Sequence, residues 1–148
     1  MPKIFESPRD NLTISTDPRR LDLDVICDLL SRAYWAQGRS RPRTERAIQN
    51  SLVFGIYDGD LQIGLARLVT DYAIFAYLCD VCILEAYRGQ GIGKWLISTI
   101  LTHPDLQDLR RCMLATRDAH DLYRRFGFET IKEPENWMES YEPAYAVS

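Results

Sequence analysis

A glycine-rich turn between an apolar run and a helical pattern constrains this chain more than any other feature. The turn reads Arg88-Gly89-Gln90-Gly91-Ile92-Gly93-Lys94. The apolar run Ile74–Leu84, interrupted by Asp80, precedes it, and helical spacing follows over residues 90–102. This order predicts a strand, a turn and a helix. Glycines let backbone N–H groups converge on an anion, and a helix N-terminus adds positive charge, so we expect the turn to bind a diphosphate.

Two common diphosphate-binding motifs do not fit this turn. A P-loop would need glycine at position 88 and serine or threonine at position 95, but Arg88 and Trp95 stand there. A dinucleotide fingerprint that started at either of the first two glycines would need a glycine at Lys94 or Leu96. Both motif readings therefore fail for this turn.

The pattern that fits is R-x-x-G-x-G, formed by Arg88, Gly91 and Gly93. It resembles the coenzyme A pyrophosphate loop of the GNAT superfamily, the acyl-CoA-dependent N-acetyltransferases. A second segment, Leu122–Phe128, is similar to the GNAT pattern L-Y-x-x-x-G-F. The two motifs stand in the expected order, and the resemblance extends over roughly residues 12–146.

The resemblance implies an α/β fold with a mixed, mostly antiparallel sheet of six to seven strands flanked by helices. Strand patterns occur at Leu12–Ser15, Leu52–Tyr57, Leu61–Val69, Ala73–Leu84 and Arg111–Thr116, and a last hairpin is expected from Phe128–Ile131 and Trp137–Tyr145. Helical patterns cover residues 21–34, 44–51, 90–102 and a segment from an Asp118 N-cap to Gly127. Residues 1–11 are expected to be a loose leader, and residues 12–148 a single domain.

Composition excludes several classes of protein. The 148 residues are 46% hydrophobic and 26% charged, which is typical of one globular domain. The net charge of −3 argues against a nucleic-acid partner. No apolar run reaches transmembrane length, and the N-terminus lacks a signal-peptide pattern, so we expect no membrane partner. The four cysteines suggest reduced thiols and a cytoplasmic protein. The two histidines are too far apart to predict a metal site.

The resemblance implies that acetyl-CoA is the acyl donor and that no metal is needed. It assigns the pantetheine arm to the backbone of Val81, Cys82 and Ile83. It assigns the pyrophosphate to Arg88, Gly89, Gly91, Gly93 and Lys94, with the amides of Gln90 and Ile92. Thr116 stands seven residues before Tyr123, where the family often has asparagine, and its hydroxyl can replace one amide hydrogen bond.

The family's reaction needs a proton donor for the leaving thiolate and a proton acceptor for the amine. Tyr123 matches the family tyrosine at the sulfur and is expected to be the general acid. Asp80 is the one acid inside an apolar strand, and it is our candidate for the general base. Three alternatives stay open: Asp80 as a structural carboxylate that caps a loop or pairs with an arginine, His120 as the base, and an ordered water in place of any side chain.

The acceptor pocket is expected opposite the coenzyme loop. Its candidate residues are Tyr34, Trp35, Arg39, Phe75 and Tyr77, with Trp137 and Tyr141 able to close it. We expect an acetyltransferase that acts on a primary amine of a small molecule. A peptide or protein amine as acceptor, and a non-catalytic acyl-CoA sensor, are the alternatives. The resemblance also allows a homodimer.

Overall fold

A single sheet organises the molecule. The computed structural model describes residues 3–145, and within them six strands pair in the order β1-β2-β3-β4-β5-β6. The strands are β1 (Glu6–Arg9), β2 (Leu12–Ser15), β3 (Leu52–Asp58), β4 (Leu61–Thr70), β5 (Phe75–Ile83) and β6 (Arg111–Leu114). Every neighbouring pair is antiparallel except β5 and β6. This confirms the predicted mixed, mostly antiparallel α/β fold.

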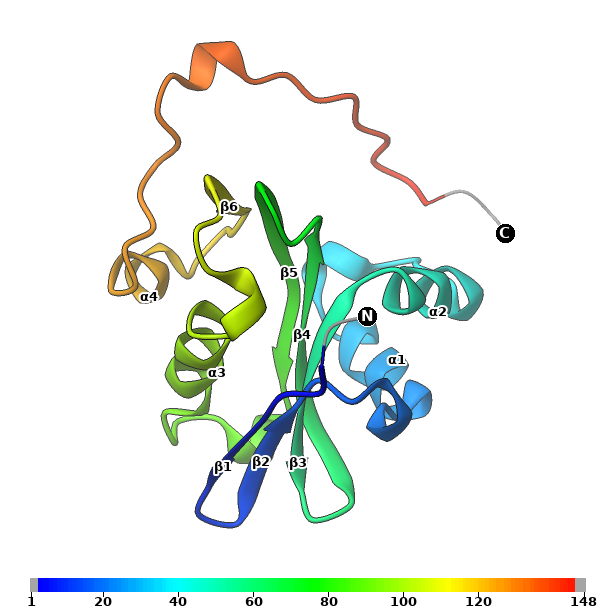
Figure 1. Ribbon diagram of the computed structural model, residues 1–148. Coiled ribbons are helices and arrows are strands. Elements are labelled where there is room, and N and C mark those ends of the chain that lie inside the picture. The colour runs from blue at the N-terminus through cyan, green and yellow to red at the C-terminus, as the bar shows by residue number, and fades with distance from the viewer. Residues whose placement is uncertain (1–2, 146–148) are drawn as a thin grey trace.

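Helices cover both faces of this sheet (Figure 1). They are α1 (Leu23–Ser31), α2 (Arg41–Gln49), α3 (Ile92–Leu101) and α4 (His120–Arg124). Helices α1 and α2 lie on one face, and α3 and α4 lie on the other (Figure 1). Helix α3 connects β5 to β6, which a parallel pair requires because its strands cannot be joined by a tight turn.

The core has two parts, one on each face. Under α3, fully buried Leu96 and Ile97 pack with Phe54 and other apolar side chains of the central strands. Under α1, Ile26 and its neighbours pack against Leu65 of β4. Burial of such side chains contributes about 1.5–3 kcal/mol each. The sheet is therefore anchored on both faces, and the ends of β5 and β6 are held in fixed positions.

The expected loose leader is wrong for residues 6–9. These residues form β1, which pairs with β2 from Glu6 opposite Ser15 to Arg9 opposite Leu12. The sequence did not predict this strand, because β1 has almost no alternation of apolar and polar residues and contains Pro8. Proline is tolerated there because β1 is an edge strand, and an edge strand does not need every backbone N–H.

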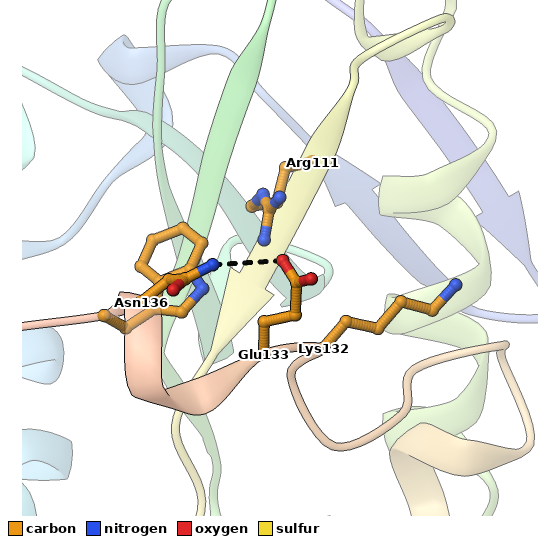
Figure 2. Close-up of a pocket in the computed structure, with 5 residues that line it drawn as sticks. Arg111, Lys132, Glu133 and Asn136 are labelled. Atoms are coloured by element: carbon orange, nitrogen blue, oxygen red, sulfur yellow. Dashed lines mark hydrogen bonds between the residues drawn. The ribbon is translucent and has the colours of Figure 1, made fainter.

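The expected C-terminal hairpin is also wrong. Within the described residues no strand follows β6, and residues 129–145 form an extended C-terminal arm with one short turn of 3-10 helix at Pro134–Asn136. At this turn, Asn136 Nδ2 donates to Glu133 Oε2 at 3.0 Å, as Figure 2 shows. The arm leaves α4, passes beyond the ends of β5 and β6, and ends on the α2 side of the sheet (Figure 1). Hairpin formation depends on contacts between the two strands, which strand propensity alone does not supply.

Two helix starts differ from the sequence prediction. Helix α2 starts at Arg41, because the Ser40 hydroxyl accepts the N–H of Arg43 and Pro42 suits the first turn. Helix α4 is not capped by Asp118. Instead, the Thr116 hydroxyl accepts the N–H of Ala119 at 3.0 Å.

Candidate active site

A β-bulge bends β5 at Asp80. Asp80 and Val81 together face Ala66 of β4, so one extra residue is inserted in β5. Asp80 has φ of 53°, in the left-handed region, which aspartate tolerates better than most residues. A bulge of this kind bends a strand and redirects its side chains. The bulge therefore turns the Asp80 carboxylate out of the regular strand pattern.

The Asp80 carboxylate is buried and accepts three hydrogen bonds. Trp35 Nε1 donates to Oδ1 at 2.9 Å, and Arg39 Nη1 and Arg67 Nε donate to Oδ2 at 2.9 and 2.8 Å. Burial acts to raise its pKa, but the hydrogen bonds and charges of the two arginines outweigh burial and hold the pKa below its ordinary value. A general base needs a pKa near the working pH. The geometry thus favours the structural, arginine-paired alternative for Asp80 over the general-base role.

Beyond the bulge, β5 separates from β6. The two strands pair from Phe75 opposite Arg111 to Leu78 opposite Leu114, and the pairing then stops. Within residues 3–145 no strand pairs with the β6-facing side of Val81–Ile83. The backbone groups on that side can bind an extended amide-containing chain as a strand would. This is the position at which the resemblance places the pantetheine arm.

Tyr123 lies beside this unpaired edge. It projects from α4, is 8% exposed, and packs its ring edge-on against Phe128 at 5.8 Å between centroids. Burial raises the pKa of its phenol, and nearby Tyr34 and Cys82 raise it further. Among residues 3–145 no side chain or backbone group hydrogen-bonds its hydroxyl. The phenol is therefore protonated at neutral pH and free to donate a proton to a bound group.

The glycine turn has the strand–turn–helix placement predicted from the sequence. Gly89 and Gly91 have φ of 79° and 76°, and Gly91 is the N-cap of α3. A side chain at Gly89 would meet no atom within 4 Å, so the backbone conformation, not crowding, requires glycine there. Ile92 is buried in the core, so only its amide can serve a ligand.

The other residues of the turn are mostly exposed, so they leave the backbone open to a ligand. Arg88, Gln90 and Lys94 are exposed around the turn. Arg88 Nε donates to the carbonyl of Ile83 at 3.1 Å, which ties the turn to the end of β5. Gly93 lies in the first turn of α3, where an added Cβ would make ordinary contact with Ile83 at 3.8 Å. Positive charge thus surrounds an open backbone surface.

Arg9 is a residue at this turn that sequence reasoning missed. Its Nη1 donates to the carbonyl of Gly91 at 3.2 Å, and its guanidinium lies 5.6 Å from the ring centroid of Trp95. It adds a third cation to those of Arg88 and Lys94. No sequence signal pointed to it, because 82 positions separate it from Gly91 and only the pairing of β1 brings it there.

The expected acceptor residues are only partly brought together. Trp35 and Arg39 meet at Asp80, and the Tyr34 ring packs edge-on against Trp35 at 5.1 Å. The Tyr34 hydroxyl accepts the N–H of Arg117 at 3.0 Å, which links the segment after α1 to the segment before α4. These contacts connect the group formed by Trp35, Arg39 and Asp80 to the segment that leads into α4, the helix that carries Tyr123.

The last two candidates for the acceptor pocket, Tyr77 and Phe75, lie on β5. Tyr77 is 37% exposed, and burial of its ring raises its pKa, with Cys79, Asp80 and Glu139 adding to the effect. The side chain of Phe75 makes no hydrogen bond or ring contact within residues 3–145. Tyr77 thus lies close to Asp80, whereas no hydrogen bond or ring contact joins Phe75 to the residues around Asp80.

The remaining candidates, Thr116, His120 and Trp137, lie away from Asp80. The Thr116 hydroxyl accepts the N–H of Ala119 just before α4, as described above, and Thr116 lines one groove together with Tyr123. His120 is the exposed first residue of α4 and lines the same groove. Trp137 lies 4.6 Å from the guanidinium of Arg111, whereas Tyr145 accepts a hydrogen bond from Arg39 Nε at 3.1 Å. The arm therefore reaches the acceptor side through Tyr145.

The described residues contain neither a cluster of metal ligands nor a membrane-spanning helix. Within the described part of the chain no three His, Cys, Asp or Glu side chains cluster as metal ligands do. In the same residues no helix is long and apolar enough to span a bilayer.

A family model described as an acetyltransferase (GNAT) domain matches residues 49–130, a range that contains the bulge, the glycine turn and Tyr123. The chain belongs to the GNAT acetyltransferase family. A provisionally named acetyltransferase of Gibberella zeae is 31% identical to this GNAT protein, over 84% of this chain and 83% of that protein. A histone acetyltransferase of Glycine max is 30% identical over 76% of this chain, which spans only 52% of that relative.

Solved structures give the same family. A crystal structure of a provisionally assigned GNAT acetyltransferase from Xanthomonas campestris has 44% identity and a TM-score of 0.87, and covers 92% of this chain and 95% of its own. A GNAT acetyltransferase from Elizabethkingia anophelis, solved with acetyl-CoA bound, has 18% identity and a TM-score of 0.65, with 84% and 80% of the two chains covered. At that identity the second likeness shows the fold alone.

Proposed function

We propose that this GNAT protein transfers the acetyl group of acetyl-CoA to a primary amine of a small molecule. One observation supports this most strongly. A buried, protonated Tyr123 phenol lies beside the unpaired backbone edge Val81–Ile83, and that edge leads into a cationic glycine turn. Edge and turn suit the two parts of the donor, its amide-containing arm and its diphosphate.

The donor site is built from three kinds of group. The backbone of Val81–Ile83 receives the pantetheine amides. The amides at Gly89–Lys94 and the N-terminus of α3 receive the pyrophosphate, as helix N-termini commonly do. Arg88, Lys94 and Arg9 neutralise its charge, and hydrogen bonds to a charged group are each worth about 1.5–3 kcal/mol.

The chemistry assigned to the chain is direct transfer. The neutral amine nitrogen forms a bond to the thioester carbonyl carbon, the carbon–sulfur bond breaks, and the sulfur takes the phenolic proton of Tyr123. The amine proton leaves through an ordered water to solvent, and the Tyr123 phenolate regains a proton from solvent. Asp80 is not assigned as the base, because it is bound to three donors and has a lowered pKa. Proton donation by a positioned side chain contributes about 10²–10⁴ in rate.

The charge at the acceptor side favours particular amines. Arg39 and Arg67 share one carboxylate, Asp80, so these three groups together carry a net positive charge. Such a charge lowers the pKa of a nearby amine and keeps it in the nucleophilic neutral form. It repels an acceptor with a second cationic group and attracts one with a carboxylate or phosphate. We therefore propose an amine that also carries an anionic group.

A turnover screen tests this function. Release of free thiol from acetyl-CoA is measured with amino acids, amino-sugar phosphates, polyamines and lysine peptides. We expect turnover with anionic small amines, at a kcat/KM at least tenfold above that for polyamines. Loss of turnover in Tyr123→Phe with retained acetyl-CoA affinity is the matched control. Preference for polyamines would contradict the acceptor class.

The screen also separates the two other functions. The likeness to a protein named as a histone acetyltransferase is the observation that favours a protein amine as acceptor, and turnover confined to the lysine peptides would support it. Calorimetric binding of acetyl-CoA without turnover on any amine would instead support a non-catalytic acyl-CoA sensor.

A further inference from the structure

His103 is a buried histidine that the proposed reaction does not use. It follows α3 in the chain and has 0% exposure. Its ring centroid lies 5.1 Å from that of Phe5, in the segment before β1, and 5.7 Å from that of Phe54 on β3. The imidazole therefore lies between the N-terminal segment and a central strand of the sheet.

The hydrogen bonding of His103 requires a neutral ring. Its Nδ1 accepts the backbone N–H of Asp105 at 3.0 Å, so this nitrogen carries no proton. The single ring proton is then on Nε2, which is buried and has no hydrogen-bond partner among residues 3–145. A second proton, on Nδ1, would point at the N–H of Asp105 and break that bond. The contacts of the ring are therefore incompatible with a protonated His103.

The surroundings of His103 oppose a positive charge. Burial lowers the pKa of His103, and the nearby Asp105 carboxylate offsets this effect only in part. The end of α3 and β3 place no charged side chain against the ring, and Gln107 Nε2 donates to the backbone carbonyl of His103 at 2.9 Å. Glu6, at the start of β1, is paired with Arg20 at 3.0 Å. Asp105 is thus the one charged group among residues 3–145 that acts on the ring.

Phe5 anchors β1 to the interior. The four residues of β1 are exposed or half-buried, and none of them belongs to the core. The Phe5 N–H donates to Thr16 Oγ1 at 2.8 Å, its carbonyl accepts the Thr16 N–H at 3.0 Å, and its ring packs on His103. At its other end, β1 carries Arg9, which donates to the carbonyl of Gly91. The ring of His103 therefore supports the strand that places Arg9 at the glycine turn.

We propose that His103 is a positioning residue for the glycine turn. Its neutral ring holds Phe5 and β1 in place, and its protonation releases β1 and withdraws Arg9 from Gly91. The release of β1 needs no ligand. Its effect on acetyl-CoA rests on the proposed function, because the turn then loses one of the three cations that neutralise the diphosphate.

The pH window of this effect lies below about 6.5, the ordinary pKa of histidine. Because contacts with β1 in place lower the pKa of His103, the open state binds a proton more readily than the closed state. The stabilisation of β1 is fully present above the open-state pKa and is lost as pH falls toward the lowered closed-state value. Ordinary carboxylates titrate near pH 4, and the pKa of Asp80 is lowered further, so the two effects occur in separate pH ranges.

NMR on the full-length chain tests the release of β1 directly. The ring nitrogens of His103 should show the Nε2–H tautomer at neutral pH and should titrate below a pH of about 6.5. The backbone amide signals of residues 5–9 should shift with the same midpoint. Phe5→Ala removes the ring that His103 supports, so its β1 amides at neutral pH should resemble those of the acidified wild type.

Two substitutions remove the titrating group and keep different contacts. His103→Phe keeps an aromatic ring against Phe5, and His103→Asn keeps an acceptor for the N–H of Asp105. In either folded variant the amides of residues 5–9 should not respond over the pH range in which the wild type does. His120→Gln is the matched control, because it removes the other histidine of the chain, which is exposed, and it should respond as the wild type does.

Calorimetry then links the strand to the donor. Acetyl-CoA affinity is compared between the wild type and Arg9→Ala at neutral pH and at one pH unit below the NMR midpoint. The phosphates of acetyl-CoA titrate equally with both proteins, so the ratio of the two Kd values isolates the contribution of Arg9. A hydrogen bond to a charged group corresponds to about tenfold or more in affinity. The ratio should be of that size at neutral pH and fall toward one in acid.

The other outcomes separate this role from the proposed function. A ratio near one at both pH values, with β1 still released by acid, would support the role of His103 and contradict Arg9 as part of the donor site. A His103 ring that stays neutral until the whole chain unfolds would overturn the proposal. So would β1 amides that do not change while His103 titrates, or a response that persists in His103→Phe, since another group would then control β1.

Discussion

Arg67 Nε lies 2.8 Å from Asp80 Oδ2, and the two residues project from adjacent strands at the bulge of β5. Asp80 has a left-handed backbone conformation at this bulge, and its carboxylate is fixed by the buried ion pair. The same bulge lies just beyond the last residue pair that joins β5 to β6. We infer that the carboxylate serves the proposed reaction indirectly, because it helps to fix the strand whose free edge is the proposed donor site.

Replacement of Asp80 by asparagine should therefore destabilise the protein. Asparagine tolerates the left-handed backbone but leaves Arg39 and Arg67 without a counter-charge. Loss of one partner from a buried ion pair costs about 3–5 kcal/mol, which urea unfolding would measure. Asp60→Asn, in an exposed turn, is the control and should be neutral. Unchanged stability together with a lost alkaline rise in kcat/KM would restore Asp80 as the general base.

Acid should unfold the wild type in a way that depends on Asp80. Its pKa is lowered in the folded state, so the unfolded chain binds the proton more readily. The stabilisation is present above the unfolded pKa of about 3.9 and is lost as pH falls through the folded value. Stability curves at pH 2 to 6 should thus be flatter for Asp80→Asn than for the wild type. Parallel curves would contradict a lowered pKa.

Tyr123→Phe should lower kcat by about 10²–10⁴, because the leaving sulfur loses its proton donor. Affinity for acetyl-CoA, measured by calorimetry, should be nearly unchanged, since the ring packing against Phe128 is retained. An unchanged kcat under conditions where the chemical step limits the rate would make Tyr123 a structural residue only.

Gly91→Val should greatly weaken acetyl-CoA binding. Gly91 has φ of 76° at the N-cap of α3, where a β-branched residue is strained and the amides of the turn must shift. Gly59→Val is the matched control, since Gly59 also has positive φ, at 59°, with nothing within 4 Å of an added Cβ. That variant should lose similar stability but bind acetyl-CoA normally. Equal affinity in both variants would remove the turn from the donor site.

Arg9→Ala should weaken acetyl-CoA binding and reduce its salt dependence. The guanidinium bonded to the Gly91 carbonyl supplies one of three cations near the turn, so its loss should cost about 1.5–3 kcal/mol of affinity. Arg32→Ala, an exposed arginine of an i,i+4 pair on the opposite face, is the control. Identical titrations at low and high salt for Arg9→Ala and the wild type would exclude Arg9 from the donor site.

The sequence was most informative where structure depends on local pattern. The order of strand, glycine turn and helix around Gly91 was predictable, because positive φ and helix starts leave residue-level signals. The hairpin of β3 and β4 was predictable for the same reason, from Asp58-Gly59 between two apolar runs. Tyr123 could be identified as a candidate because its motif is contiguous.

Tertiary structure decided the features that join distant residues. Asp80 was ambiguous in the sequence, and only its contacts with Arg39 and Arg67 distinguish an ion-paired carboxylate from a base. Arg9 reached the glycine turn through a strand with no apolar pattern. The segments after α4 had strand propensity, but within residues 3–145 no strand forms there, because a strand also needs a neighbouring strand to pair with. Local patterns therefore identified the family and the glycine turn, whereas long-range contacts decided the surroundings of Asp80 and Arg9 and the path of the C-terminal arm.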